Sequence, residues 1–208
     1  MNTRKAYDSW SAQYDTNINK TRDREARALQ QTLAAIEFDS CLEIGCGTGK
    51  NTSWLIGKAR EITAVDLSDE MLAKARAKID AKNVDFLQAD ILHDWDFVHK
   101  KYELVSFSLV LEHIENLEAV FFKVSEVIAA GGHMYIGELH PFKQYTGSKA
   151  RFTTAEGEQV VTCFDHHVSD FVKAAKKYGF EILDINEYFD DDQPALPRIL
   201  TLLFRMPW

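Results

Sequence analysis

The stretch SCLEIGCGTGKNTSWL, residues 40–55, combines a short apolar run, a glycine-rich turn and the start of a helix-compatible segment. Its three glycines, Gly45, Gly47 and Gly49, stand at alternate positions. Glycine permits positive φ in a tight turn, and its missing Cβ lets a ligand lie directly on backbone N–H groups at a helix N-terminus. The stretch therefore predicts a strand, a turn and a helix start that together hold a small polar molecule.

The spacing of the glycines argues against the two common nucleotide-binding motifs. A dinucleotide fingerprint, GxGxxG, would require a glycine where Lys50 stands. A phosphate loop, GxxxxGK[ST], would require a glycine at Ile44 and a hydroxyl residue at Asn51. Neither motif fits, so the pattern indicates a different ligand.

Length and composition are those of one ordinary globular domain. The chain has 208 residues, of which 46% are hydrophobic and 27% are charged. No apolar run has the length of a membrane span, and the polar N-terminal region is unlike a signal peptide. The three cysteines form neither metal-ligand spacing nor an even disulfide framework, so we expect a cytoplasmic protein. The net charge of -8 argues against a broad nucleic-acid or membrane surface.

Two further β-prone runs lead to acidic residues. The first, residues 62–65, ends at Asp66, which lies 21 positions after Gly45. This offset is close to the ~20 residues at which an acid meets ribose hydroxyls in nucleotide-binding folds. The second contains Val84, Phe86 and Leu87 and leads into Ala89-Asp90-Ile91. We expect both carboxylates at the carboxyl edge of a parallel sheet.

Three motifs resemble those of the class I S-adenosylmethionine (SAM) dependent methyltransferases of small molecules, type 11-like. They are Glu-x-Gly-x-Gly-x-Gly at residues 43–49, Asp-x-Ser-x-x-Met-Leu at 66–72 and Leu-Glu-His-Ile at 111–114. The resemblance spans about residues 42–204, with its specific motifs between Glu43 and His113. It implies an α/β, Rossmann-like fold with a seven-stranded, mostly parallel sheet. The last strand would be antiparallel, helices would cover both faces, and an N-terminal helical segment would form a lid. The implied cofactor is SAM.

The resemblance also implies which residues bind the cofactor. Asp66 would hold the ribose, Met71 would pack near the adenine, and Asp90 would accept from the adenine amine. Tyr14 belongs to an aromatic face at helical spacing that either caps the sheet or forms the lid. The full predicted set is Tyr14, Glu43, Gly45, Cys46, Gly47, Gly49, Asp66, Leu67, Met71, Asp90, Ile91 and Ser108.

We expect a single domain over residues 1–208, with residues 1–38 as the helical lid. Residues 117–130 predict a helix that Gly131 and Gly132 end. Residues 142–168 lose the regular pattern, which predicts a hairpin or flap. Insertions at this place build the acceptor pocket in this fold, by analogy.

Methyl transfer from a sulfonium needs a general base only if the acceptor must lose a proton. The candidate catalytic residues are His113 and His140, which are expected at strand ends near the cofactor, followed by His166 and His167. A metal site is not expected, because Leu109 replaces the first acid of the Glu-x-x-Glu-His metal motif found in related quinone O-methyltransferases. The chain also lacks the Asn/Asp-Pro-Pro-aromatic run expected for methylation of a base amine.

These patterns favour an enzyme that transfers a methyl group from SAM to an oxygen or nitrogen of a small-molecule acceptor. The alternatives are a SAM-binding regulatory module without catalysis and an RNA or protein methyltransferase. A nicotinamide dehydrogenase is disfavoured by Lys50. We expect no nucleic-acid or membrane partner, and the sequence leaves monomer and homodimer open.

Overall fold

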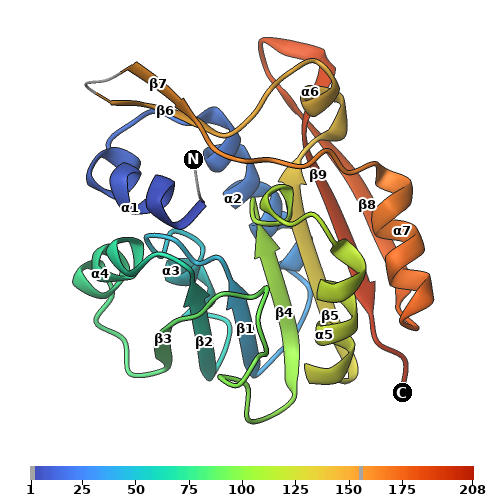
Figure 1. The fold of residues 1–208 in the computed structure, drawn as a ribbon. Coiled ribbons are helices and arrows are strands. Elements are labelled where there is room, and N and C mark those ends of the chain that lie inside the picture. The colour runs from blue at the N-terminus through green and yellow to red at the C-terminus, as the bar shows by residue number, and fades with distance from the viewer. Residues whose placement is uncertain (1–2, 155–156) are drawn as a thin grey trace.

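A computed structural model describes residues 3–154 and 157–208 of the chain (Figure 1). Residues 1–2 of the expected lid and 155–156 of the expected insertion lie outside the described residues. The strands are β1 (Ser40–Ile44), β2 (Glu61–Asp66), β3 (Val84–Gln88), β4 (Tyr102–Ser108), β5 (Ile128–Leu139), β6 (Arg151–Thr154), β7 (Gly157–Val160), β8 (Glu181–Asp190) and β9 (Gln193–Arg205). The helices are α1 (Thr3–Tyr14), α2 (Lys20–Leu33), α3 (Thr52–Leu55), α4 (Asp69–Lys78), the 3-10 helix η1 (Leu111–His113), α5 (Leu117–Val127), α6 (Pro141–Tyr145) and α7 (Val168–Lys177).

The main sheet has seven strands in the order β3-β2-β1-β4-β5-β9-β8. Strands β1 to β5 pair in parallel, whereas β9 runs antiparallel to both of its neighbours, β5 and β8. The expected Rossmann-like sheet with an antiparallel last strand is confirmed. Because β1 and β4 are adjacent while β2 and β3 extend the other way, the strand order reverses between them, where open α/β sheets bind ligands.

The two faces of the sheet bury separate apolar cores. Leu42 and Ile44 of β1 belong to a core that includes Phe121 of α5 and residues of α7. Cys41, one position away, belongs to a core with Leu29 of α2 and residues of α3 and α4. Successive side chains of a strand point to opposite faces, so a strand buried on both sides is apolar throughout. Helices therefore cover both faces, as expected.

The predicted helix over residues 117–130 is wrong at its end. Helix α5 stops at Val127, and β5 begins at Ile128, which pairs with Tyr102 of β4. A register shift between Tyr102 and Leu104 follows, and Gly131 has φ +74. The glycines thus form an irregularity inside a strand rather than a helix end, because pairing with β4 outweighs local helix propensity.

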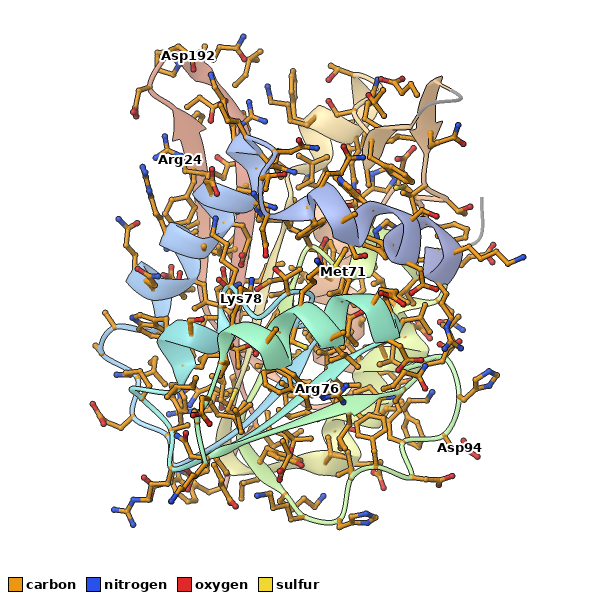
Figure 2. All side chains as sticks on the ribbon, turned by 90° about the vertical axis from the view of Figure 1, so that its left-hand side faces the viewer. Arg24, Met71, Arg76, Lys78, Asp94 and Asp192 are labelled. Carbon is orange, nitrogen blue, oxygen red and sulfur yellow. The ribbon has the colours of Figure 1, made fainter. Side chains whose placement is uncertain are left out.

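A third apolar cluster lies beyond the carboxyl ends of the strands. Trp10 of α1 stacks on Phe152 of β6 with ring centroids 5.2 Å apart, and Met71 of α4 belongs to the same cluster. Ser68 donates to the carboxylate of Asp8 at 2.6 Å, which joins α1 to the start of α4. Figure 1 shows α1 and the β6–β7 hairpin together above the sheet, and Figure 2 shows the N-terminal helices over α4, where Met71 is labelled.

Within residues 3–154 and 157–208, no helix combines the length and apolarity that crossing a membrane requires.

Replacing Gly45 by alanine is expected to destabilise the fold strongly. Gly45 has φ +73, and an added Cβ would lie 2.1 Å from Val110 Cγ2. A left-handed backbone conformation and a tight contact together cost about 2–5 kcal/mol. Urea unfolding of Gly45→Ala measures this loss.

Gly57→Ala is the matched control, because its Cβ would meet only Trp54 O at 3.6 Å. It should change the free energy of unfolding by less than about 0.5 kcal/mol. Equal effects of the two substitutions would contradict the proposed close approach at Gly45.

Candidate functional site

The glycine turn closes onto the end of β2. Asp66 accepts from the backbone N–H of Gly47 through Oδ2 at 2.8 Å and from that of Ser68 through Oδ1 at 2.8 Å. Gly45 donates its N–H to the carbonyl of Val65 at 2.7 Å. Gly47 has φ +54, and an added Cβ would meet nothing within 4 Å, so open space lies beside the turn. The turn is thus held from β2 and leaves room for a ligand above it.

A cavity of about 320 Å³ begins at this open space and extends along the carboxyl ends of β1, β2 and β4. Most of the residues predicted to bind a cofactor line it, and so does one predicted base. These residues are Tyr14, Gly45, Gly47, Asp66, Leu67, Met71, Asp90, Ile91, Ser108 and His113. Ten positions predicted from separate motifs therefore share one cavity.

A smaller cavity of about 40 Å³ adjoins the large one at the glycine turn. The predicted residues Glu43 and Cys46 line it. The two cavities share five wall residues: Tyr14, Gly45, Gly47, Ser108 and Leu109. The smaller cavity also has walls that sequence reasoning missed: Arg22, Glu25, Thr48, Lys50 and Asn51. Its lining is richer in charged and amide groups than that of the larger cavity.

Two predicted site residues line neither cavity. Gly49 has φ +81, and an added Cβ would lie 2.6 Å from Ile79 Cδ1, so this glycine packs the turn against the end of α4. His140 follows β5, where its Nδ1 accepts from the N–H of Phe142 at 3.0 Å and caps α6. Its Nε2 lies 2.8 Å from Glu187 Oε1. The fold therefore turns His140 away from the large cavity.

His113 is held in one tautomer by its neighbours. Its Nδ1 lies 2.8 Å from the carbonyl oxygen of Thr162, which only accepts, so Nδ1 carries a proton. Its Nε2 lies 2.8 Å from the hydroxyl of Tyr7 on α1. In the neutral ring Nε2 is an acceptor, and Tyr7 donates to it. Tyr7 and Thr162 also line the large cavity, and the aromatic spacing in α1 was the one sequence signal for Tyr7.

The other two candidate histidines have supporting contacts. His166 is buried, and its Nε2 lies 2.7 Å from the carbonyl of Ile114 and 3.2 Å from that of Leu111. It therefore ties the ends of η1, the short helix that carries His113. The Nδ1 of His167 lies 2.6 Å from the hydroxyl of Tyr145 on the exposed side of the hairpin region.

The turn between β4 and η1 is strained and braced from β5. Leu109, which lines both cavities, has φ +57, a conformation that non-glycine residues rarely adopt. Glu138 is buried and accepts from the N–H groups of Val110 at 2.9 Å and Leu111 at 2.8 Å. Strain at such a place persists only where surrounding contacts impose it. Glu138 therefore fixes the wall from which His113 extends.

The segment after β3 is held by a lysine that no motif indicated. Lys123 of α5 donates to three successive carbonyls, those of Ile91, Leu92 and His93, at 2.9, 3.1 and 2.6 Å. Asp90 accepts from the N–H of Leu92 at 2.9 Å. These contacts define the shape of the cavity wall at Asp90 and Ile91.

Buried carboxyl groups surround the glycine turn. Burial raises the pKa of Glu25 and of Glu43 to about 7, and it raises the pKa of Asp66 to about 6. It also raises the pKa of Glu138 to about 8. Hydrogen bonds from Asn51 and Thr52 lower the pKa values of Glu25 and Glu43, respectively, without offsetting burial. The site therefore binds protons near neutral pH.

In the described part of the chain, no group of three or more His, Cys, Asp or Glu side chains is placed to hold a metal ion.

A family model described as a methyltransferase domain matches residues 41–132. An uncharacterized methyltransferase, AN0656, of Emericella nidulans is 24% identical over 89% of this chain and 78% of its own length. The malonyl-[acyl-carrier protein] O-methyltransferase of Enterobacter lignolyticus is 31% identical over 55% of this chain, which spans 44% of that protein. The solved DhpI-SAM-HEP complex has 25% identity and a TM-score of 0.77, with 96% of this chain and 94% of that chain covered.

The pKa of Glu138 predicts how stability depends on pH. Its ordinary value is 4.5 and burial raises it to about 8, so the folded state keeps a proton that the unfolded chain loses between these values. The resulting stabilisation is complete below about pH 4.5 and is lost as pH rises through 8. Glu138→Gln keeps an acceptor for both N–H groups and has no proton to lose. Its free energy of unfolding should therefore fall less than that of the wild type between pH 5 and 9, by roughly 1–4 kcal/mol.

Urea unfolding across this pH range is the measurement, and the exposed Glu126→Gln is the control, which should follow the wild type. Parallel curves for Glu138→Gln and the wild type would mean that Glu138 is ionised throughout.

Proposed function

This chain is a class I S-adenosylmethionine-dependent methyltransferase domain, and we propose that it transfers the methyl group to an oxygen or nitrogen of a small molecule bound beside His113. One observation carries the proposal: Asp66 and Asp90 line the same cavity as Tyr7 and His113. The first pair suits a nucleoside and the second suits a group that loses a proton.

The residues present fit the cofactor. Asp66 sits at the carboxyl end of β2, where a carboxylate accepts from both hydroxyls of a ribose. Gly47 leaves open space above the turn, and Asn51 Oδ1 is buried without a partner among the described residues. We propose that the nucleoside occupies the large cavity between Asp66 and Asp90, and that the amino-acid end extends to the small one past Gly47.

When bound, SAM supplies an electrophilic methyl group on a sulfonium sulfur. The chain orients the acceptor and removes its proton. We propose that the acceptor donates its proton to the hydroxyl oxygen of Tyr7 while Tyr7 passes its own proton to His113 Nε2. The carbonyl oxygen of Thr162 accepts the proton that His113 carries on Nδ1, so Nε2 of the same ring is left as the acceptor. Burial raises the pKa of Tyr7 well above its ordinary value, so Tyr7 stays neutral and relays a proton rather than holding a charge.

The two segments above the sheet are proposed to enclose the acceptor. The N-terminal segment, residues 1–38, acts as the lid, because α1 places Tyr7 and Tyr14 on the cavity. The insertion, residues 142–168, completes the acceptor side, because Thr162 and Phe164 line the same cavity. Together they make residues 1–208 one functional domain.

The character of the large cavity supports a small acceptor. Its charged lining in the described part of the chain is Asp66 and Asp90, with His113 beside them, which disfavours a phosphate backbone. We propose a cytoplasmic enzyme with no nucleic-acid or membrane partner, in agreement with its acidic composition and its free cysteines. Monomer and homodimer are both compatible with this mechanism.

Asp66→Ala is expected to weaken SAM binding about 10- to 100-fold, because the hydrogen bonds of a charged acceptor are lost. Isothermal titration calorimetry measures the change, and a thermal unfolding curve confirms that the variant is folded. Asp85→Ala removes an exposed acid on the neighbouring strand β3 and should keep the wild-type Kd. An unchanged Kd in Asp66→Ala would remove Asp66 from the ribose role.

Turnover separates an enzyme from a domain that only binds SAM. The wild type should form S-adenosylhomocysteine (SAH) when a small-metabolite extract is supplied, and little without it. His113→Gln should lower this rate about 10²- to 10⁴-fold, the usual contribution of a general base, while the Kd for SAH stays constant.

His140→Ala tests the second predicted base in the same assay. Because His140 caps α6 and lines neither cavity, this variant should be less stable yet keep its turnover within a few fold. Unaltered turnover in both histidine variants would leave the cavity without its proposed base. SAM binding by the wild type without any turnover would favour the non-catalytic module.

A further inference from the structure

The small cavity contains a buried acid that belongs to no motif. Glu25 comes from α2 and is 2% exposed. Its Oε1 accepts from the hydroxyl of Tyr135 at 3.1 Å, and its Oε2 accepts from Asn51 Nδ2 at 2.9 Å. Both donors are neutral, so two hydrogen bonds hold the carboxyl group in place without neutralising a charge on it.

Strand β5 has a glycine, Gly137, where the side chain of Glu25 packs against it. A Cβ on Gly137 would lie 2.5 Å from Glu25 Oε1 and 2.4 Å from the hydroxyl of Tyr135. Any larger residue at this position would displace the pair. The fold therefore contains dedicated space for a carboxyl group at the back of the small cavity.

The cations of the small cavity are engaged elsewhere. Lys50 forms an ion pair with Asp23, and Arg22 donates to the backbone carbonyl of Tyr14. Glu43 also lines this cavity and is also buried, with Thr52 as its neutral donor at 2.6 Å. The carboxyl groups of two glutamates thus lack a directly paired cation in the described structure, and burying unpaired charges is costly.

We propose that Glu25 is a counterion for the ammonium group of the cofactor's amino-acid end in the small cavity, and that cofactor binding ionises Glu25 and releases its proton to solvent. This inference rests on the proposed function, because it assigns the amino-acid end to the small cavity. In the balanced step a neutral carboxyl group and an ammonium ion become a carboxylate–ammonium pair and one free proton.

The titration of neighbouring groups supports this assignment. The titratable side chains that line the small cavity with Glu25 or contact it are Tyr14 of α1, Arg22 of α2, Glu43 of β1, Lys50 before α3 and Tyr135 of β5, and Tyr188 of β8 acts electrostatically on Tyr135. Burial raises the pKa of Tyr14 to about 12 and that of Tyr135 well above its ordinary value, so neither changes charge near neutrality. Glu25 and Glu43, with pKa values raised to about 7, are the groups that titrate there, and an ionised Glu25 raises the pKa of Glu43 further, so that Glu43 keeps its proton when Glu25 loses its own.

Calorimetry in buffers of different ionisation enthalpy tests the release. SAH should be titrated into the full chain between pH 6 and 7.5, because α-amino groups with a pKa of about 7.7–8.0 stay mostly protonated there. The apparent binding enthalpy should differ between phosphate and Tris. Divided by the difference between the two buffer ionisation enthalpies, this difference should correspond to release of about 0.5–1 proton near pH 6.5. The affinity should rise about 5- to 10-fold from pH 6 to 7.5, because the ionised form binds.

5′-Methylthioadenosine is the matched ligand, because it keeps the nucleoside and lacks the amino-acid end. Its binding should release no proton and should show no such pH dependence. Glu25→Gln should weaken SAH about 10-fold or more at pH 7.5 and flatten the pH dependence, and it should leave methylthioadenosine unaffected. Glu126→Gln, which replaces an exposed acid on α5, is the control and should behave as the wild type.

Equal binding enthalpies for SAH in both buffers, measured on the wild type, would overturn the inference. This outcome does not depend on whether Glu25→Gln folds. Proton release that persists in folded Glu25→Gln would assign it to another group and remove Glu25. In both cases SAM binding and turnover would leave the proposed function intact. Failure of the wild type to bind SAH at all would instead remove the proposed function and this inference with it.

Discussion

The hydrogen bond from the Gly47 N–H to Asp66 joins two strands at the point where the rest of the site is assembled. It forms only if the turn after β1 bends back over β2, and this bend requires glycine φ values of +73, +54 and +81. The close packing of Gly45 against Val110 then sets the distance between this turn and the one after β4. Both cavities border this turn, so their shape depends on its backbone torsion angles.

A second constraint is the concentration of acids around this backbone. Glu43 and Asp66 belong to β1 and β2, the strands that carry the sequence motifs. Glu25 belongs to α2 and Glu138 to β5, and both accept hydrogen bonds from neighbouring elements. The three glutamates are buried and Asp66 is half-buried, and desolvation raises the pKa of each toward or above neutrality. A protein gains no stability from such groups when they are ionised. Their presence is explained by what they hold: Glu138 braces the strained turn at Leu109, and the others face the cavities.

Sequence patterns predicted the sheet and most of the residues that line the large cavity, because both depend on short spacings. Asp66 lies at the end of an apolar run, and the carboxyl ends of parallel strands meet at one edge, so its position follows from β2 alone. The pairing of Tyr7 with His113 joins residues 106 positions apart, and no local pattern encodes that distance. The sequence predicted His140 at the end of a strand, where the structure has it. Its side chain caps α6, however, because the five residues that follow it form that helix. Glu25 gave no signal, because an acid on a helix is ordinarily a solvated one.

The place of β9 in the sheet has a consequence for the order of folding. This strand, residues 193–205, lies between β5 and β8, and α2 packs across β5, β8 and β9. An early segment of the chain therefore docks on a late one, and these contacts close a loop of more than 150 residues. During synthesis α2 has no complete surface to pack on until β9 has left the ribosome. The contacts of α2 with β8 and β9 are therefore completed only after the last two strands have been synthesised.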